Sequence, residues 1–240
     1  RSTLFPYTTL FRSLGDIIDR DQKDLDSVLI CLKHLNKKIF HTTGNHDYKG
    51  ITDNKVLYKK LKMPSEYYSF MKKNWVFVFL NTNEIAAYSN VVGTAKEQEL
   101  LRIQNQIKVN KEIQGARWNG GVSSRQLQWL DNLLKKSEKK NRNVLIFCHH
   151  PLYPRSQFTA LNNMEILDVI NRYNCVKAIF SGHHHSGAFG YFDHIPCNTV
   201  EGMIETPDKN SFGIVRIYKD RIELEGKERM TSRLDRKSVV

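Results

Sequence analysis

Three consecutive histidines are the first residues whose type and spacing could do chemistry. Residues 183–185 follow an apolar run, Val176 to Phe180, and a Ser181-Gly182 turn. A short apolar run ended by a turn indicates a buried strand, and open α/β sheets bind ligands beyond the carboxyl ends of their strands. Imidazoles at such a place could bind a metal, or they could only satisfy local hydrogen bonds. The partners supplied by the rest of the chain decide between these readings.

Similar polar side chains follow other predicted strands and open other loops. They come from four separate segments: Asp16 and Asp19; Asn45, His46 and Asp47; His149 and His150; His183 and His185. Oxygen and imidazole ligands of this kind suit a borderline divalent metal such as Mn, Fe or Zn, whereas a thiolate site would draw on cysteines. Four such strand ends in one domain predict a shared metal site.

The elements that must position these residues can be read from periodicity. Leu25, Val28, Leu29, Leu32 and Leu35 follow a helical period. Further expected elements are strands at 38–42, 75–80, 144–148 and 176–180, helices at 94–111, 127–135 and 164–173, and a hairpin of 215–218 with 221–224 that turns at Lys219-Asp220. Ser123 and Gln126 have the spacing of a capping box at the start of the second of these helices. The helix at 94–111 is expected to be an excursion from the core. The alternation of strand, loop and helix predicts an α/β fold.

Length and composition place broad limits on the protein. At 240 residues the chain can form one domain with a core that needs no disulfide framework. Its four cysteines form no CxxC pair and mostly sit in apolar runs, which predicts buried free thiols in a reducing compartment. No apolar run approaches the ~20 residues of a membrane helix. These features predict a soluble, cytoplasmic protein with no membrane partner.

The formal net charge of +12 invites a nucleic-acid interpretation. The lysines are scattered over predicted helix faces and lack the interleaved aromatic residues of a single-strand platform. We therefore expect a solvated basic surface and no specific nucleic-acid partner. A positive field would still help to collect an anionic nucleotide. The sequence does not indicate an oligomeric state.

Four short blocks identify a family resemblance. Gly-Asp-x-x-Asp-Arg at 15–20, Gly-Asn-His-Asp at 44–47, His-x-Pro at 149–151 and Gly-His-x-His at 182–185 resemble successive blocks of the calcineurin-like metallophosphoesterase superfamily, in their usual order. The stretches 67–70, 118–130 and 201–207 resemble its branch of manganese-dependent ADP-ribose/CDP-alcohol diphosphatases. The resemblance implies an α-β-β-α sandwich of two mixed sheets flanked by helices. It spans about residues 14–225 and implies a catalytic domain over residues 14–234, whose first strand is expected to be incomplete.

Carried over to this chain, the resemblance implies two divalent metal ions, Mn above all, with Fe, Zn or Mg as alternatives. Asp16 would bridge them, Asn45, His149 and His183 would complete the second site, and His185 would serve the first. Two such metals can activate water and hold both the attacking and the departing oxygen. His46, backed by Asp47, would be the general acid.

Other residues are expected to support the metals or contact the substrate: Asp19, Arg20, Trp118, Asn119 and His150. Asp19 and Arg20 could be only a hydrogen bond and ion pair that orient their loop. His150 and His184 occupy the variable positions of their blocks, which favours solvent-facing or substrate-edge side chains over ligands. Trp118 and Tyr67 could stack on a nucleobase or pack in the core. His34, His41 and His194 are expected to be structural.

The two ends of the chain depart from the family pattern. Residues 1–13 and 235–240 have the appearance of translated adapter sequence, so both segments are expected to be non-native. The family's first block, Asp-x-His, supplies two ligands to the first metal, and Thr-Leu-Phe-Arg-Ser stands at its place here. We therefore expect one metal to bind well and the other poorly, with impaired activity.

The predicted function is hydrolysis of the diphosphate bond of a nucleoside diphosphate derivative, such as ADP-ribose or CDP-choline, by metal-activated hydroxide. Two alternatives remain open. The same scaffold could act on a phosphomonoester, a cyclic nucleotide or a nucleic-acid phosphodiester, because specificity belongs to the walls of a site. The chain could also be an inactive nucleotide-binding fragment.

Overall fold

The computed structural model describes residues 10–235 of the protein. Residues 1–9 and 236–240, most of the two segments predicted to be non-native, lie outside the described residues. In chain order the elements are β1 (Phe11–Ser13), α1 (Gln22–Lys33), β2 (Ile39–His41), a 3-10 turn (His46–Tyr48), α2 (Asn54–Lys60), β3 (Tyr68–Lys72), β4 (Trp75–Phe79), α3 (Ala95–Val109), α4 (Ser124–Lys139), β5 (Asn143–Phe147), α5 (Asn163–Ile170), β6 (Val176–Ser181), β7 (Ala188–Phe192), β8 (Ile195–Thr199), β9 (Ser211–Ile217), β10 (Ile222–Glu228) and β11 (Arg233–Asp235).

A six-stranded sheet forms the centre of the molecule, in the order β3-β4-β5-β6-β8-β7. Strands β4, β5, β6 and β8 are parallel, and the two edge strands are antiparallel to their neighbours. Each face of β4 is buried against a different layer. Val76 and Val78 pack towards α4 and α5, whereas Phe77 and Phe79 pack towards the smaller sheets. The predicted buried strand at 75–80 is thus confirmed, and it is apolar throughout because both of its faces are covered.

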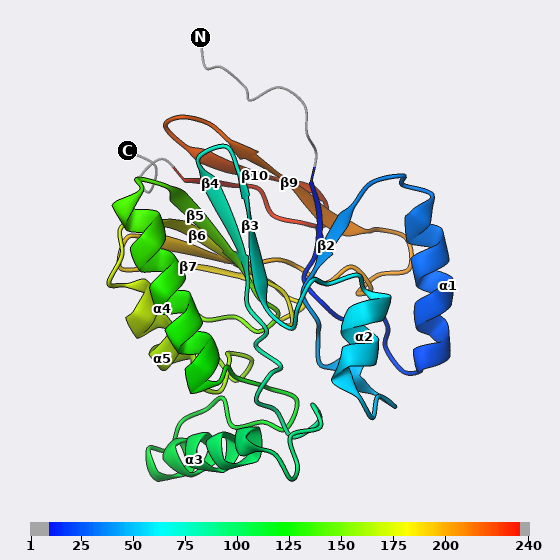
Figure 1. Cartoon of the computed structure of the whole chain (residues 1–240). Helices are drawn as coiled ribbons and strands as arrows, with labels where there is room; N and C mark the ends of the chain where they lie inside the picture. The colour runs from blue at the N-terminus through cyan, green and yellow to red at the C-terminus, as the bar shows by residue number, and fades with distance from the viewer. Residues whose placement is uncertain (1–9, 236–240) are drawn as a thin grey trace.

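A second layer lies against the other face of this sheet and consists of two separate small sheets (Figure 1). One is the parallel pair β1-β2, and the other is the antiparallel sheet β9-β10-β11. Phe40, Val215 and Ile217 face the core from this layer. The expected hairpin is confirmed, since the N–H of Tyr218 donates to the carbonyl of Arg221 at 2.9 Å across a two-residue turn. The sandwich is present, but its second layer is divided rather than a single mixed sheet.

Strand β1 falls in a segment where the sequence pattern predicted no element. Phe11–Ser13 pairs with Ile39–His41 in parallel register. The side chain of Arg12 lies over the rings of Phe77 and Phe147, 4.7 and 4.8 Å from their centroids. Three residues are too few to show a period of apolar side chains. The strand is stabilised by main-chain pairing with β2 and by the contacts of Arg12 with the two rings.

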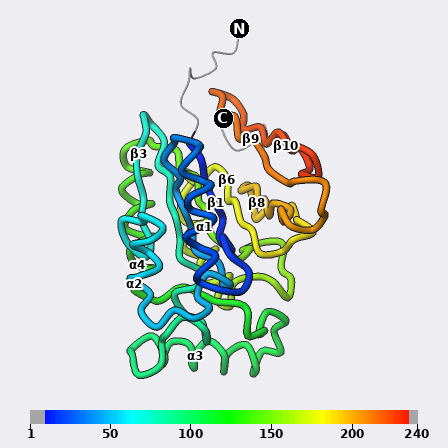
Figure 2. Tube along the Cα trace, turned by 90° about the vertical axis from the view of Figure 1, so that its right-hand side faces the viewer, coloured from blue at the N-terminus to red at the C-terminus, as the bar shows by residue number. Residues whose placement is uncertain are grey.

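The helices cover both sides of the sandwich. Helices α4 and α5 pack on the six-stranded sheet, and α1 and α2 lie beside β2 (Figure 1). Helix α3 lies at the end of the molecule opposite the β9-β10 hairpin in both views (Figures 1 and 2). Its buried residues belong to a small separate cluster that includes Ile85, Val91 and Leu161. The predicted excursion is confirmed.

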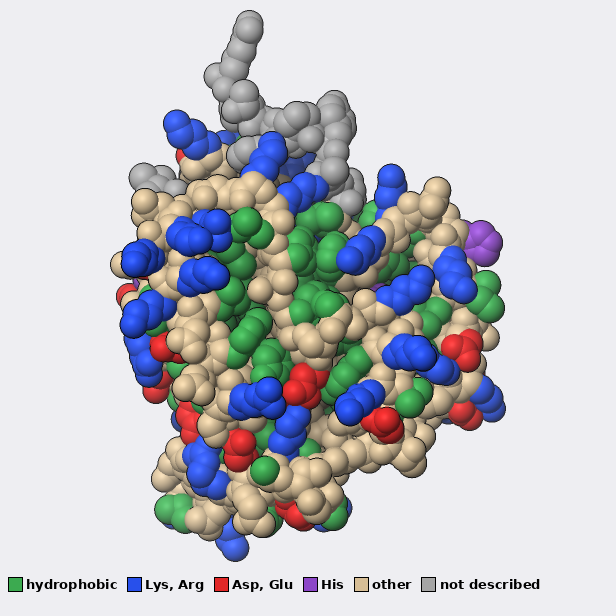
Figure 3. All heavy atoms as spheres, in the orientation of Figure 1, with side chains coloured by type: hydrophobic (Ala, Val, Ile, Leu, Met, Phe, Trp, Pro, Cys, Tyr) green, Lys and Arg blue, Asp and Glu red, His purple; other side chains and the backbone are tan. Residues whose placement is uncertain are grey.

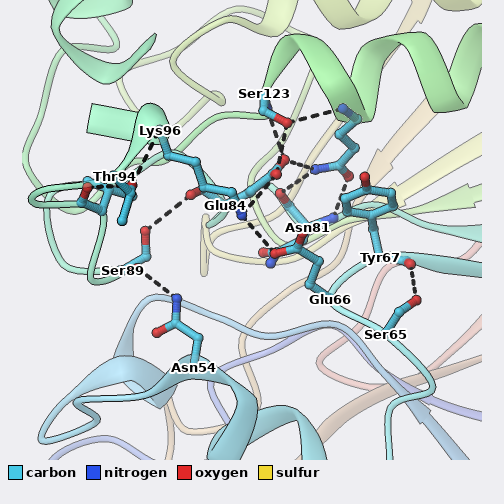
Figure 4. A network of polar contacts seen from close by, with 12 residues as sticks. Asn54, Ser65, Glu66, Tyr67, Asn81, Glu84, Ser89, Thr94, Lys96 and Ser123 are labelled. Carbon is cyan, nitrogen blue, oxygen red and sulfur yellow. Dashed lines mark hydrogen bonds and ion pairs between the residues drawn. The ribbon is translucent and has the colours of Figure 1, made fainter. Parts of the chain in front are cut away.

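A polar network fixes the start of α4 and the end of β4 (Figure 4). Ser123 caps the helix, since its Oγ accepts the N–H of Gln126 at 3.1 Å. The buried carboxylate of Glu84 accepts the N–H and hydroxyl of Ser123 and contacts Lys96 of α3. The side chain of Gln126 bonds Glu84 and the carbonyl of Asn81 rather than the N–H of Ser123. The predicted capping box is therefore half correct, and α4 begins at Ser124 instead of Leu127.

Two predictions from composition can be compared with this fold. Of the four free cysteines, Cys148, Cys175 and Cys197 are buried as expected, whereas Cys31 is exposed on α1. Within residues 10–235, none of the helices has the length and apolar character needed to cross a bilayer.

Candidate metal centre

The loops after β1 and β2 touch through their backbones. Gly44 lies so close to Asp16 that a Cβ at this position would be 2.1 Å from the Asp16 Oδ1 atom. Only glycine permits this approach. The N–H of His46 donates to the same Oδ1 atom at 2.9 Å. The Gly-Asp and Gly-Asn-His-Asp blocks thus form one surface, from which the carboxylate of Asp16 projects.

Asp47 holds these two loops together. Its buried carboxylate accepts N–H groups from Asp16 at 3.0 Å, Ile17 at 2.8 Å, Ile18 at 3.3 Å and Gly44 at 2.8 Å. The sequence prediction that Asp47 backs His46 is wrong in its geometry. The carboxylate turns inward to four main-chain donors, because burial of an ionised oxygen demands such partners.

His46 is supported by Asp19 instead. Nδ1 of His46 lies 2.8 Å from the carbonyl oxygen of Asp19 and 3.1 Å from its Oδ1 atom. Arg20 pairs with the same carboxylate at 2.9 Å, and Nζ of Lys49 donates to the Asp19 carbonyl at 3.1 Å. The His46 side chain is one-third exposed. It therefore sits at the surface of the site, with its Nδ1 occupied.

Three side chains converge on His149, which follows β5. The carbonyl of Leu14 lies 2.6 Å from Nδ1 of His149, so Nδ1 carries a hydrogen and Nε2 is the ring atom that can take up a further proton or bind a cation. That Nε2 atom faces Asn45 Oδ1 at 3.1 Å, His183 Nδ1 at 3.1 Å and Asp16 Oδ2 at 3.4 Å. A cluster of lone pairs is repulsive unless a proton or a metal cation lies among them. Imidazole, carboxylate and amide oxygen together fit a divalent ion such as Mn, Fe or Zn.

The electrostatics of the cluster also favour a cation. Burial alone would raise the pKa of Asp16, but His149 and the N–H of His46 outweigh it and lower that pKa to about 2. Burial alone would lower the pKa of His149, but the Asp16 carboxylate outweighs it and raises that pKa. Burial and the neighbouring His150 and His149 strongly lower the pKa of His183. These shifts favour an ionised Asp16 carboxylate, a proton or metal cation at His149, and a neutral ring at His183.

His150 lies beside this cluster and is buried, so the solvent-facing alternative for this residue is wrong. It is fully buried, and His149, His150 and His183 offer ring nitrogens within 4.8 Å of one another. Its Nδ1 and Nε2 atoms already have partners in Thr82 and Trp118. Burial and His149 lower its pKa to about 3. The position of His150 in the His-x-Pro block could not indicate its burial. His150 is covered by the segment after β4, which is distant in the sequence.

The other two histidines of the triple run diverge from His183. His184 stacks on Phe158, with ring centroids 4.5 Å apart. His185 points Nδ1 at Glu205 Oε1, 2.5 Å away, and its side chain is 41% exposed. The structure thus brings Asp16, Asn45, His149 and His183 together and places His185 outside that cluster.

The remaining predicted site residues come from the loop after α3. Asn119 is buried, and its Oδ1 atom lies 3.0 Å from Nε2 of His183. Trp118 is 49% exposed, so it does not pack in the core, whereas Tyr67 packs on Trp129 with centroids 4.9 Å apart.

Sequence reasoning missed three contacts of the site. The Leu14 carbonyl has no side-chain signal, because any residue could supply it. Thr82 carries a signal that was available, since it lies three residues after the end of β4, in the polar stretch 81–84. Glu205 belongs to the 201–207 stretch, which was noted only for its resemblance.

Known proteins resemble this chain over most of its length. The sequence matches the family described as calcineurin-like phosphoesterase over residues 9–187. It is 31% identical to a manganese-dependent ADP-ribose/CDP-alcohol diphosphatase of Bos taurus, covering 92% of this chain and 77% of the relative. It is 30% identical to the protein of the same name in Homo sapiens, covering 92% and 76%.

Among solved structures, a dimetal phosphatase from Danio rerio matches with a TM-score of 0.85 at 26% identity, covering 94% of this chain and 83% of that one. The resemblance and the fold class predicted from sequence are confirmed. The chain belongs to the calcineurin-like phosphoesterase family and is a hydrolase of phosphate esters or anhydrides.

Proposed function

We propose that the protein is a manganese-dependent hydrolase that cleaves the diphosphate bond of nucleoside diphosphate derivatives such as ADP-ribose or CDP-choline. The names of the relatives in Bos taurus and Homo sapiens support the substrate class. The observation that carries the chemistry is the convergence of Asn45 Oδ1, His183 Nδ1 and Asp16 Oδ2 on Nε2 of His149, at 3.1 to 3.4 Å.

Asp16, Asn45, His149 and His183 would hold one ion, and Asp16 with His185 would contribute to a second. When bound, divalent ions would polarise phosphoryl oxygens and lower the pKa of water at the site. The ligands themselves are rigid. The N–H of His46 holds the Asp16 carboxylate, and the Leu14 carbonyl holds the His149 ring. This rigidity limits the reorganisation that binding requires.

His46 is proposed as the general acid. Because Nδ1 of His46 is engaged by Asp19, the nitrogen free to exchange a proton with a substrate is Nε2. A proton given by Nε2 to the departing phosphate oxygen would prevent charge from building up there. Asp19 would orient the ring, with Arg20 and Lys49 supporting Asp19. Asp47 would act indirectly, by fixing the two loops that present Asp16 and His46.

The surface around the proposed site offers an aromatic side chain and positive charge to the substrate. Trp118 is the exposed ring of the loop that carries Asn119, and it offers a face to a nucleobase. The chain carries a formal charge of +12, and on the face in Figure 3 lysines and arginines are spread among acidic and apolar side chains. A dispersed positive field favours small anionic substrates and does not form a nucleic-acid track.

The test is a substrate panel with Mn²⁺-loaded protein: ADP-ribose, CDP-choline, p-nitrophenyl phosphate and single-stranded DNA. The expected result is turnover of ADP-ribose to AMP and ribose 5-phosphate, with slower release of p-nitrophenol. Hydrolysis of DNA alone would contradict the proposal and favour the phosphodiesterase alternative. Mn²⁺ binding without turnover of any phosphate compound would favour the inactive nucleotide-binding fragment.

A further inference from the structure

The side-chain amide of Asn119 is fixed in one orientation. Its Nδ2 atom donates to the carbonyl of Gln114 at 2.8 Å and to that of Gln157 at 2.7 Å. Only 1% of Asn119 is exposed. A flipped amide would set its oxygen against both carbonyls and would bury two lone pairs without donors. Oδ1 of Asn119 must therefore face His183, where Nε2 lies 3.0 Å away.

This orientation decides where His183 carries its hydrogen. An amide oxygen only accepts, so Nε2 of His183 must be the protonated nitrogen of the neutral ring. The lone pair is then on Nδ1, which faces Nε2 of His149 at 3.1 Å. The structure assigns to Asn119 the role of a positioning residue that sets the tautomer of His183 and so presents Nδ1 to a metal. The assignment rests on the proposed metal-dependent function and adds an atomic cause for the affinity of its site.

His150 fixes the neighbouring peptide in the same way. The Trp118 carbonyl accepts from Nε2 of His150 at 3.2 Å, so Nδ1 of His150 accepts from the Thr82 hydroxyl at 2.9 Å. Both ring nitrogens are used, which removes His150 from the candidate ligands although it lies within the histidine cluster. It instead holds the carbonyl one residue before Asn119.

The glycine pair that follows completes the clamp. A Cβ on Gly120 would lie 2.4 Å from the Thr82 carbonyl, and one on Gly121 would lie 2.5 Å from Asn162 Oδ1. These approaches require glycine. Each residue from Trp118 to Gly121 is therefore fixed by a hydrogen bond or a close backbone contact. Asn119 cannot shift to accommodate a different orientation of the His183 ring.

Three variants test the assignment. Asn119→Leu removes the acceptor and both donors. Asn119→Asp keeps an acceptor for Nε2–H of His183 but loses the donors to the two carbonyls. Gln157→Ala is the matched control, because only the main-chain carbonyl of Gln157 takes part. The tautomer of His183 is read from long-range ¹H–¹⁵N spectra of the metal-free protein, assigned with a His183→Gln variant. Mn²⁺ affinity is read from the signal of free Mn²⁺ in electron paramagnetic resonance, and folding from the thermal midpoint.

Asn119→Leu is expected to weaken the tighter Mn²⁺ site about 10- to 100-fold and to give a mixture of His183 tautomers. Asn119→Asp should retain the Nε2–H tautomer while lowering the thermal midpoint, and Gln157→Ala should match the unaltered protein. If folded Asn119→Leu keeps the tautomer and the affinity, the assignment is wrong. If that variant does not fold, an Nδ1–H tautomer in Asn119→Asp overturns the assignment. Absence of Mn²⁺ binding by the unaltered protein would instead overturn the proposed function.

Discussion

At His46 the main chain and the side chain serve different partners. The N–H of His46 donates to Asp16, whereas its imidazole turns to Asp19. The residue can therefore be changed at the side chain without removing the hydrogen bond that orients Asp16. This separation makes the proposed acid role testable at one position.

We expect His46→Gln to lower kcat by about 100-fold or more, because a positioned general acid contributes factors of that size. Mn²⁺ affinity should be unchanged, since His46 provides only its N–H to a ligand. Steady-state rates of ADP-ribose hydrolysis would give kcat, and their dependence on Mn²⁺ concentration would give the Mn²⁺ affinity. His34→Gln, at the residue that follows α1, is the control for loss of an imidazole. A normal kcat in His46→Gln would exclude the role.

Asp47 gives a prediction about stability. In Asp47→Asn, Nδ2 would replace one carboxylate oxygen and face N–H groups that need an acceptor. The expected loss is about 3 kcal/mol of unfolding free energy, measured by urea denaturation without metal. Asp208→Asn, at an exposed residue, is the matched control. Equal midpoints for the two variants would show that the four hydrogen bonds add nothing.

At the scale of the elements, strand β2 contains a buried titratable histidine, His41, that is not one of the proposed metal ligands. His41 is 4% exposed, its Nδ1 atom has no hydrogen-bond partner, and burial lowers its pKa to about 4. The unfolded chain would bind a proton near pH 6.5. The folded state therefore loses stability as the pH falls from about 6.5 to about 4, because only the unfolded state is protonated in that window.

The His41 contribution should reach about 3 kcal/mol at the acid end of this window. We expect His41→Phe to reduce the slope of unfolding free energy against pH between 6.5 and 4. His150, His183 and Asp47 also have shifted pKa values and remain in the variant, so the difference in slope between the two proteins reports His41. Chemical denaturation at several pH values is the measurement, and identical slopes for both proteins would contradict the assignment.

The elements differ in how well periodicity foretold them. β4 and the β9-β10 hairpin were predicted because each has a complete pattern of apolar residues and a turn. β1 was missed because three residues carry no period, and its stability comes from β2 and from the rings under Arg12. The capping box of α4 formed only in part because Glu84, 39 residues away from Ser123, takes the N–H that Gln126 would have bonded.

For the whole molecule, the number of ligands predicts unequal metal sites. Among the described residues, Asp16, Asn45, His149 and His183 gather at one position, whereas His185 lies apart and pairs with Glu205, so the proposed second site has fewer ligands. We expect one tightly bound Mn²⁺ and a second bound at least about 10-fold more weakly. Equilibrium dialysis would measure the stoichiometry, and two equal equivalents would contradict the expectation.

Metal removal should also change global stability. An ion that binds only the folded state adds about 2.7 kcal/mol when its free concentration is 100 times its dissociation constant. A chelator should therefore lower the thermal midpoint of the Mn²⁺-loaded protein. The same chelator should have no effect on an Asn45→Ala/His149→Ala variant, which lacks two of the proposed ligands.

The sequence by itself determined the family, the sandwich and the residues that could bind metal, because short blocks at strand ends fix both the chemistry and the order of the fold. Only the tertiary structure decided which atoms each of those residues contacts. Asp47 faces main-chain donors rather than His46, His150 is buried with both nitrogens engaged, and His185 lies with Glu205 apart from His183. Neighbours in sequence share a strand end, but hydrogen-bond partners are set by segments tens of residues away. The direction of a ring nitrogen is therefore a property of packing that no local pattern records.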